Sequence, residues 1–338
     1  MTQDENDIIL LAHGSGGKLS HELVENRFLP FLSNPVLAKL DDSAVFEVGG
    51  RIAFTTDSYV VNPLFFPGGD IGKLAVCGTV NDLSMSGAVP LYMSLALIIE
   101  EGLPMKELEQ VLQSIKATAD ETGTQIITGD TKVVSHGQAD KLFINTAGIG
   151  IVPDDINVSG AGARIGDKII LSGTIGDHGI AIMSLREGLK FSVPVESDCQ
   201  PLNKLVQQML EVSSTIRCLR DPTRGGLATT LNEIATQSQK GIFINEAAVP
   251  VKEAVRAACE LLGLDPLYIA NEGKLVAVVE SSEADKILAS MKRNLCGKDA
   301  AIIGEITAEH AGKTIMKTRL GSSRMLDMLS GDLLPRIC

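Results

Sequence analysis

Residues 70–99, with the sequence DIGKLAVCGTVNDLSMSGAVPLYMSLALII, decide the fold of the first half of the chain. Residues 70–84 carry apolar side chains at the spacing of a buried helix, at Ile71, Leu74, Ala75 and Leu83. Residues 91–99 are a continuous apolar run, which is typical of a buried strand. A buried helix followed by a buried strand predicts a domain in which helices pack against a sheet.

The alternation of helix and strand extends to both sides of this stretch. Apolar periodicity predicts further strands at residues 7–11, 44–48, 51–56, 125–128 and 141–152, and further helices at 19–28 and 104–121. The Gly49-Gly50 pair lies between two of these strands and predicts a hairpin.

The second half repeats the mixture after residues 153–166, a stretch rich in Gly, Pro and Asp that is the predicted linker. Strands are predicted at 168–171, 241–245, 275–280 and 301–306, and helices at 177–186, 201–211, 225–237, 251–262 and 283–293. We therefore expect an α/β (α+β) protein with a first domain at residues 1–155 and a second domain at 164–318.

Residues 319–338 are rich in Gly, Ser and small apolar residues and are expected to form a mobile tail, with a docked helix around 325–329 as the alternative. The tail ends at Cys338. A thiol at the end of a pliable segment can be carried into another protein's active site. The thiolate is the nucleophilic form, and the nearby guanidinium of Arg336 is expected to favour it.

Composition narrows the class of protein. The length of 338 residues suits two domains. The formal net charge of −12 argues against a surface for nucleic acid or for an anionic membrane. The 6 cysteines include no C-x-x-C pair, which argues against a disulfide framework and a structural zinc site. The acidic start and the lack of an apolar run of ~20 residues predict a cytoplasmic protein.

Aspartates lie at predicted strand ends and inside the buried helix, at Asp41-Asp42, Asp57, Asp82 and Asp130. A buried carboxylate is costly unless it is paired or binds a metal ion. Carboxylate oxygens suit Mg²⁺, which bridges them to phosphate oxygens. Each aspartate alone is explained as well by a helix cap or a turn. Asp82 is the hardest to explain in that way, because it lies in an otherwise apolar helix.

A glycine-rich loop at residues 13–18 (HGSGGK) is a candidate anion site. It resembles a phosphate loop but lacks the Walker A pattern, because Ala12 and Leu19 occupy the positions where that pattern needs Gly and Ser or Thr. Its backbone N–H groups and Lys18 can still bind an anion.

The second half has two similar loops, at residues 172–179 and 220–226, where glycines and an aspartate precede predicted helices. Helix capping explains them equally well. His178 in the first of these loops is either a structural histidine or an acid/base group. Glu272 lies in a turn before a predicted strand, where a surface carboxylate would be unremarkable.

Seven motifs together resemble one family: His13-Gly-Ser-Gly-Gly-Lys18, Asp41-Asp42-Ser43, Thr55-Thr56-Asp57, Val80-Asn81-Asp82-Leu83, Thr128-Gly129-Asp130-Thr131-Lys132, Asp221-Pro-Thr-Arg-Gly-Gly-Leu227 and Pro335-Arg336-Ile337-Cys338. In this order, over essentially the whole chain, they resemble the HypE family, the carbamoyl dehydratases of [NiFe]-hydrogenase maturation. The terminal Pro-Arg-Ile-Cys distinguishes this family within a superfamily that includes aminoimidazole ribonucleotide synthetase, selenophosphate synthetase and thiamine-monophosphate kinase.

The resemblance implies an aminoimidazole-ribonucleotide-synthetase-like fold whose first domains pair their sheets in a homodimer, with ATP and Mg²⁺ at the interface. The implied metal ligands are Asp42, Asp57, Asp82 and Asp221. The implied nucleotide contacts are Gly16, Gly17, Lys18, Asn81, Asp130 and Thr131. The implied partners are the carbamoyltransferase HypF and the HypC–HypD complex, which receives cyanide for its iron.

The implied reaction is the ATP-dependent dehydration of an S-carbamoyl group on Cys338 to a thiocyanate. A thiocarbamate does not lose water readily, because hydroxide is a poor leaving group. Phosphorylation of the carbonyl oxygen replaces it with phosphate, and a positioned base must remove the nitrogen protons. We assign Glu272 as that base and Lys132 as the cation that stabilises the developing oxygen charge.

Three other functions remain open. A selenophosphate synthetase would carry a reactive cysteine in the amino-terminal glycine loop, where this chain has Gly17 before Lys18. An aminoimidazole ribonucleotide synthetase or thiamine-phosphate kinase would have no need of Cys338. A non-enzymatic maturation scaffold would use the acidic sites only for structural cations.

Overall fold

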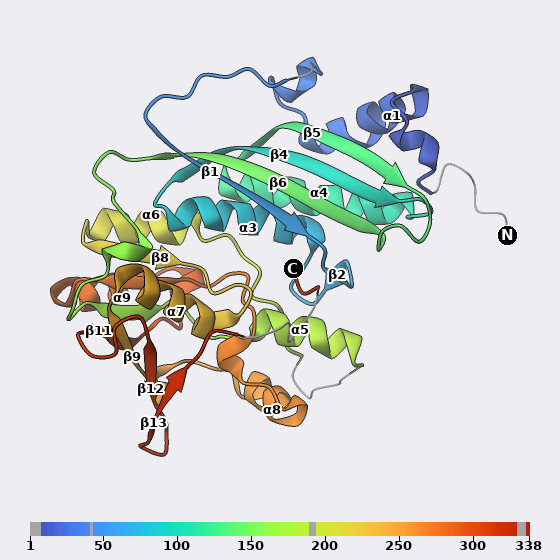
Figure 1. The fold of residues 1–338 in the computed structure, drawn as a ribbon. Helices are drawn as coiled ribbons and strands as arrows, with labels where there is room; N and C mark the ends of the chain where they lie inside the picture. Colours follow the sequence, from blue (N-terminus) through green and yellow to red (C-terminus); the bar gives the residue numbers. More distant parts are fainter. Residues whose placement is uncertain (1–7, 41–42, 189–193, 330–335) are drawn as a thin grey trace.

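The computed structural model describes residues 8–40, 43–188, 194–329 and 336–338, which form two α/β domains stacked on each other (Figure 1). In the first domain the strands are β1 (Arg51–Tyr59), β2 (Phe65–Phe66), β3 (Gly69–Asp70), β4 (Val89–Glu100), β5 (Gln125–Val134) and β6 (Leu142–Val152). Its helices are α1 (Lys18–Leu23), α2 (Leu29–Leu32), α3 (Ile71–Met85) and α4 (Met105–Thr122), with a π-helical turn at Val24–Phe28 between α1 and α2.

In the second domain the strands are β7 (Lys168–Leu171), β8 (Ile216–Arg220), β9 (Gly241–Asn245), β10 (Val276–Val279), β11 (Ala301–Thr307), β12 (Thr314–Lys317) and β13 (Ser323–Leu326). Its helices are α5 (Asp177–Arg186), α6 (Asn203–Val212), α7 (Gly226–Ser238), α8 (Glu253–Leu262) and α9 (Ala284–Met291).

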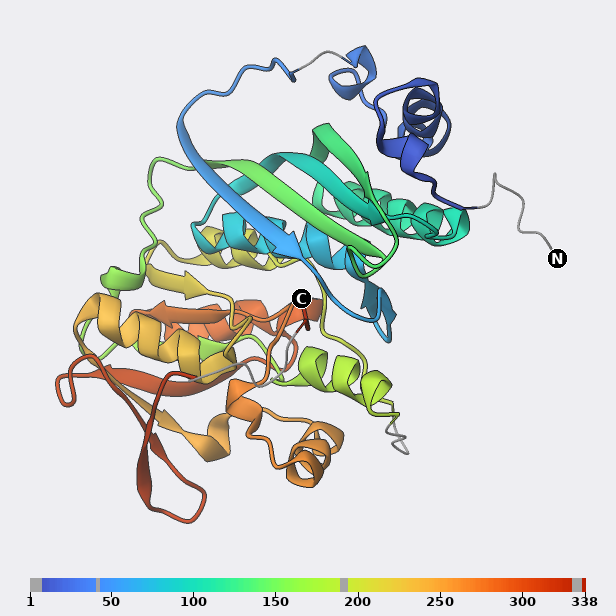
Figure 2. The same ribbon diagram turned by 45° about the vertical axis from the view of Figure 1, so that its right-hand side comes forward.

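The first sheet has the order β1-β6-β4-β5, antiparallel except for the parallel pair β4 and β5. Helices α3 and α4 cover one face of it, and the opposite face is not covered by them (Figure 2). The core lies between the sheet and these helices, where Leu74, Leu108 and Ile144 are almost completely buried. Gly78 allows α3 to approach β1, because a Cβ there would lie 2.3 Å from the Tyr59 hydroxyl.

The second sheet has the order β13-β12-β9-β11-β7-β10-β8 and is covered on both faces. On β7, Ile169 and Leu171 pack with α7, whereas Ile170 packs with α6 and α9. This alternation follows from the two-residue period of a strand, and it explains why a strand buried on both faces is apolar throughout.

Asn81 on α3 joins the two domains through a buried side-chain amide. Its Nδ2 donates to the carbonyl oxygens of Gln200 (3.2 Å) and Glu272 (3.4 Å), and its Oδ1 accepts from the Leu202 N–H (2.7 Å). Because a buried amide without partners is costly, these bonds fix the position of α3 against the second domain. The helix that carries Asp82 is thereby held beside the turn that carries Glu272.

The predicted α/β class with two domains is confirmed. The predicted helix at 70–84 and strand at 91–99 correspond to α3 and β4, and the helices predicted in the second half correspond to α5 to α9. No helix among the described residues is long and apolar enough to cross a membrane.

The predicted hairpin at 44–56 is wrong. Residues 44–48 have no assigned strand pairing in the described chain, while β1 pairs with β6 through nine residues. The predicted strand at 7–11 is also wrong over its described part, because Ile8 makes only an isolated bridge to Pro104 and a 3₁₀ turn starts at Leu11. Alternating apolar residues gave the same local signal in both segments, but only a tertiary partner makes a strand.

Some strands are longer than predicted or were missed. β5 continues to Val134, so that Gly129 to Lys132 lie inside a strand and not after it, because β4 offers a parallel partner along the whole length. The predictions omitted the short strands β2 and β3 and also β8, β12 and β13. The alternative of a helix around 325–329 is wrong, since Ser323–Leu326 pairs with β12. Residues 330–335 of the predicted tail lie outside the described residues.

Asp70 caps α3, and replacing it with Ala should lower the free energy of unfolding by about 1–2 kcal/mol. The Asp70 Oδ1 atom accepts from the N–H groups of Gly72 (2.7 Å) and Lys73 (3.1 Å), and its Oδ2 accepts from the Ser114 hydroxyl. Urea unfolding measures the change. Asp120→Ala is the control, since this exposed residue forms an i,i+4 ion pair with Lys116 within α4. Equal stability losses in the two variants would contradict the capping role.

Candidate functional site

Three aspartates influence one another at the boundary between the domains. Asp57 lies on β1, Asp82 on α3, and Asp221 directly follows β8. Burial, reinforced by the negative charge of Asp82, raises the pKa of Asp57 to about 6. Burial and the same charge of Asp82 raise the pKa of Asp221 to about 7. Burial is the largest cause in both cases and the charge of Asp82 the next, so the three carboxylates lie near enough to interact in a poorly hydrated place.

Local structure orients two of these carboxylates. The two-residue period of β1 turns Thr55, Asp57 and Tyr59 toward α3, and the Thr55 hydroxyl donates to Asp82 Oδ2 (2.7 Å). The Tyr59 hydroxyl donates to Asp57 Oδ2 (3.3 Å). Among the described residues, no group of three or more Asp, Glu, His or Cys side chains is arranged to hold a metal ion. Asp42, the fourth predicted ligand, lies outside the described residues.

Glu272 faces the same boundary from the second domain. It is 4% exposed, and its Oε1 atom has no hydrogen-bond partner in the described structure. Burial raises the pKa of Glu272 well above its usual value, and neighbouring Cys199, Asp198, Asp221 and Asp57 raise it further. A buried carboxyl group whose pKa is shifted by burial and by neighbouring ionisable groups is a candidate for proton transfer.

The turn that carries Glu272 is held rigidly. The Asp198 carboxylate accepts from the backbone N–H groups of Glu272 (3.3 Å) and Gly273 (3.2 Å), and it forms an ion pair with Lys274 (3.2 Å). Asn271 donates from Nδ2 to the Pro222 carbonyl oxygen (2.8 Å). This last bond fixes the Glu272 turn to the segment that follows Asp221.

The end of the chain enters this boundary. Both views place the C terminus between the two sheets, close to the end of β1 (Figures 1 and 2). Ile337 is 3% exposed, and the Val60 N–H donates to the Cys338 carbonyl oxygen (3.3 Å). Burial raises the pKa of the Cys338 thiol, and the charge of Glu272 and a hydrogen bond with it raise that pKa further. Cys338 and Glu272 are therefore brought together.

The expected activation of Cys338 by Arg336 is wrong for this docked position. The Arg336 guanidinium is paired with Asp140. The positive charge that favours the thiolate comes from Arg224, and burial outweighs it. The docked thiol is accordingly protonated and a poor nucleophile.

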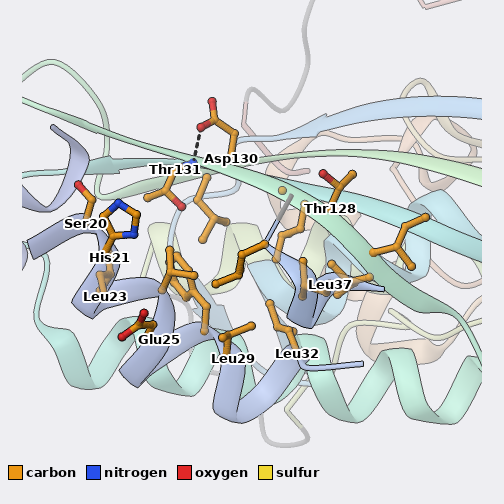
Figure 3. Close-up of a pocket in the computed structure, with 18 of the residues that line it drawn as sticks. Ser20, His21, Leu23, Glu25, Leu29, Leu32, Leu37, Thr128, Asp130 and Thr131 are labelled. Atoms are coloured by element: carbon orange, nitrogen blue, oxygen red, sulfur yellow. Dashed lines mark hydrogen bonds between the residues drawn. The ribbon is translucent and has the colours of Figure 1, made fainter. Parts of the chain in front are cut away.

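A second group of predicted residues surrounds a separate cavity of about 390 Å³. Gly16, Asp130, Thr131 and Lys132 line it together with apolar side chains of α1, α2 and the turn between them (Figure 3). The Thr131 N–H donates to Asp130 Oδ1 (2.9 Å), as Figure 3 shows.

Three other predicted residues lie outside that cavity lining. Lys18, whose side chain is 87% exposed, pairs with Glu22 (3.5 Å), and Gly17 precedes it as the N-cap residue of α1. Asn81 is the domain-bridging residue described above, so its amide is already occupied. Nucleotide binding by these residues stays a prediction.

Lys132 does not accompany Glu272 in the described chain. Its ammonium lies 3.9 Å from Asp130 Oδ1, and the Lys132 side chain is 66% exposed. The structure therefore brings Cys338, Glu272, Asp57, Asp82 and Asp221 to one boundary, and it places Lys132 with the glycine loop.

Sequence reasoning did not identify Asp198, Arg224 and Tyr59 as residues of this site. Arg224 stands inside the quoted Asp221-Pro-Thr-Arg motif, which was the available signal. Asp198 lies in a stretch that carries no recognised motif, and Tyr59 lies just beyond the predicted strand at 51–56, so neither was singled out. Their roles depend on contacts with residues far away in the chain.

Comparisons with known proteins identify the family. A model of the AIR synthase related protein N-terminal domain matches residues 40–152, and a model of the corresponding C-terminal domain matches residues 164–317. The chain is 52% identical over 334 residues to carbamoyl dehydratase HypE of Azotobacter vinelandii, covering 98% of each chain. It is 48% identical over 336 residues to carbamoyl dehydratase HypE of Escherichia coli K12, covering 98% of this chain and 99% of that relative.

Solved structures agree with this result. A crystal structure of hydrogenase maturation protein HypE in complex with ATP superposes with a TM-score of 0.94 and 52% identity, covering 97% of this chain and 99% of that one. A HypE chain from a HypE–HypF complex superposes with a TM-score of 0.81 and 49% identity, covering 91% and 99%. This chain belongs to the HypE family of carbamoyl dehydratases.

Proposed function

We propose that this protein dehydrates an S-carbamoyl group on its own Cys338 to a thiocyanate, at the expense of ATP. The observation that carries the proposal is the position of Cys338, whose thiol lies beside the buried Glu272 at a boundary that also holds Asp57 and Asp221. A carbamoyl group on that sulfur would lie within reach of a proton-transfer group and of the carboxylates.

The chemistry fits the described residues. ATP transfers its terminal phosphoryl group to the carbonyl oxygen of Cys338 S–C(=O)–NH₂, and ADP leaves. Phosphate then departs as the nitrogen loses its protons, which forms S–C≡N. Glu272 is the proposed proton acceptor in this step, because its carboxyl group lies buried beside Cys338.

Lys132 is proposed to stabilise charge on the reacting oxygen. Its ion pair with Asp130 is long, at 3.9 Å, and largely exposed, so the ammonium can leave it at little cost in free energy. For the nucleotide we propose the cavity beside the glycine loop. Its lining by Gly16, Asp130 and Thr131 supports this assignment, and Gly17 and Lys18 follow Gly16 in the chain. For Asn81, nucleotide contact stays what the resemblance implies, because its amide bonds are made at the domain boundary.

Mg²⁺ is the proposed metal ion, with Asp57, Asp82, Asp221 and Asp42 as its proposed ligands; the three described carboxylates would have to move closer together to bind it. Hard carboxylate oxygens are its preferred protein ligands, and repulsion among the first three would be relieved by a cation. When bound, Mg²⁺ neutralises phosphate charge during phosphoryl transfer.

We also propose a homodimer formed through the uncovered face of the first sheet. Ile52 and Phe54 on β1 lie on that face and are 55% and 67% exposed. They stand opposite Ile151 and Ile149 of β6, so that the apolar surface extends across strands. Contiguous apolar side chains exposed on one face of a sheet are typical of a protein interface.

The remaining proposals concern the pathway. The carbamoyl group would come from HypF, and the cyanide would pass to iron on the HypC–HypD complex in the cytoplasm. The solved HypE–HypF complex supports the first of these partners by analogy.

Glu272→Gln should slow dehydration about 10²- to 10⁴-fold, because the amide cannot accept the proton. Intact mass after incubation with HypF, carbamoyl phosphate and ATP follows the gain of a carbamoyl group and the ATP-dependent loss of one water. Glu283→Gln, which changes an exposed ion pair with Lys286, is the matched control. Cys338→Ala should show neither mass change. A carbamoylated wild-type protein that never loses water would favour a scaffold.

In a chelator, the stability of the wild-type protein should fall as pH rises from about 4 to about 7. The pKa values of Asp57 and Asp221 are raised in the folded state, so the unfolded state loses these protons at lower pH than the folded state does. Raising the pH through this range therefore stabilises the unfolded state relative to the folded state and lowers the free energy of unfolding. Asp221→Asn should reduce the slope of unfolding free energy against pH. In a second series with Mg²⁺ in place of the chelator, this slope should decrease more in the wild type than in the variant. Urea unfolding at several pH values measures this. A slope that is the same in both proteins would contradict the proposed carboxylate site.

Phe54→Lys should convert the dimer to a monomer, because it places a charge in the proposed apolar interface. Light scattering after size-exclusion chromatography measures the mass. Leu261→Lys is the control, since Leu261 is 70% exposed on α8 in the second domain. If both variants remain dimeric, this face is not the interface.

A further inference from the structure

A second cavity, of about 320 Å³, lies in the second domain. Residues 172–174, in the glycine-containing loop between β7 and α5, form one part of its lining, and residues of the segment 295–299, which follows α9, form another. Among the described residues, neither Glu272 nor Cys338 nor any of the proposed metal ligands lines it. The cavity is therefore distinct from the carboxylate boundary and from the cavity beside the first glycine loop.

Three lysine side chains from three different segments line this cavity: Lys252 at the start of α8, Lys274 shortly before β10, and Lys298 after α9. Lys252 forms an ion pair with Asp177 (2.8 Å), and Lys274 forms one with Asp198 (3.2 Å). Lys298 is exposed and has no ion pair with any residue of the described chain. Because an ammonium group carries three N–H donors, each lysine retains at least one donor for a ligand.

The two paired carboxylates are less accessible than the lysines that they bind. The side chains of Asp177 and Asp198 are 1% and 2% exposed, whereas that of Lys252 is 50% exposed. Asp177 Oδ2 also accepts from the Thr174 hydroxyl (2.7 Å), and the Asp198 carboxylate also accepts from two backbone N–H groups of the Glu272 turn. These carboxylates are thus buried and already hydrogen-bonded, and a ligand in the cavity would meet ammonium groups first.

The accessible charge of the lining is positive. Asp299 is exposed and lines the cavity, but it stands against the exposed Lys298 and the half-exposed Lys252. This excess of cations occurs in a chain whose formal net charge is −12. Convergence of lysines on one concave site, against the sign of the whole chain, is the electrostatic pattern of an anion site.

The remaining lining leaves room for an organic molecule. A Cβ at Gly173 would lie 3.2 Å from Lys274 Cε, so the absence of a side chain there lets Lys274 pass close to the loop. Leu295 is 88% exposed and, with Cys296, offers an apolar surface to a carbon skeleton. The volume lies at the lower end of the range for small-molecule sites, which suits an occupant larger than a bare phosphate ion.

We propose that this cavity binds a small organic oxyanion, whose phosphate or carboxylate group is held by Lys252, Lys274 and Lys298. Lysine binds either group as a point charge, so the shared chemistry is the oxyanion and the test separates the two sources. The carbon skeleton lies along Leu295. This site is additional to the proposed dehydration and does not depend on it.

The test titrates the full-length protein with ribose 5-phosphate, D-gluconate and neutral D-ribose, and it measures the dissociation constants by ligand-observed NMR. At least one of the two anions should bind about 10-fold or more tightly than ribose, because hydrogen bonds to a charged group are stronger than neutral ones. The tighter anion identifies the preferred acidic group. A saturating non-hydrolysable ATP analogue should not displace it, because the proposed nucleotide cavity is a separate one.

Lysine variants locate the bound anion. Lys298→Ala should weaken binding about 3- to 10-fold, and Lys252→Ala should weaken it at least as much, because this change also uncovers the charge of Asp177. Lys292→Ala is the matched control, since Lys292 is exposed near the same helix end but does not line the cavity. Lys298 has no structural contact to lose, so a loss of affinity in its variant cannot be ascribed to misfolding.

Three results would each overturn the proposal. These are equal affinities for ribose and both anions, displacement of the anion by the ATP analogue, and wild-type affinity in Lys298→Ala and Lys252→Ala. The titration needs neither HypF nor turnover, so its outcome is independent of whether Cys338 is carbamoylated and dehydrated.

Discussion

Carboxylates crowded at the boundary between two domains are the constraint on which the rest of the site depends. Asp57, Asp82 and Asp221 come from a strand, a helix and a loop that are far apart in the chain, and Glu272 joins them from the second domain. Burial and the neighbouring negative charges raise the pKa values of Asp57, Asp221 and Glu272, so these carboxylates repel one another unless a cation or protons are bound. Binding a cation or taking up protons would lower the repulsion among these carboxylates.

Hydrogen bonds elsewhere in the fold hold the carboxylates in place despite their mutual repulsion. Asn81 joins α3 to the second domain, Asp198 holds the turn around Glu272, and Asp70 caps the start of α3. None of these three carries a reacting group in the proposed mechanism. They keep the carboxylates at fixed positions, because each bond is buried or partly buried and its loss would leave an unsatisfied polar group.

The docked tail adds a restraint on reactivity. Burial and the proximity of Glu272 hold the Cys338 thiol in its protonated form, whereas the nucleophilic form is the thiolate. Under the proposed function, Cys338 would therefore receive the carbamoyl group while undocked and be dehydrated in the docked position. The exposure of the Arg336–Asp140 pair suits such a cycle, because the contact is specific but weak.

The sequence by itself determined the apolar helix of residues 70–84, the strand of 91–99 and the motifs that contain Asp57, Asp82, Asp221 and Glu272, since burial periodicity and turn chemistry are local properties. It could not distinguish the extended segment 44–48 from a strand, nor find β8, β12 and β13. Only the tertiary structure decided that Arg336 pairs with Asp140, that Arg224 faces the thiol and that Lys132 lies with Asp130. The first two outcomes depend on which side chains far apart in the chain meet in space, because charge interactions follow spatial distance. The third follows from the extension of β5, which carries Lys132 with Asp130 and away from Glu272.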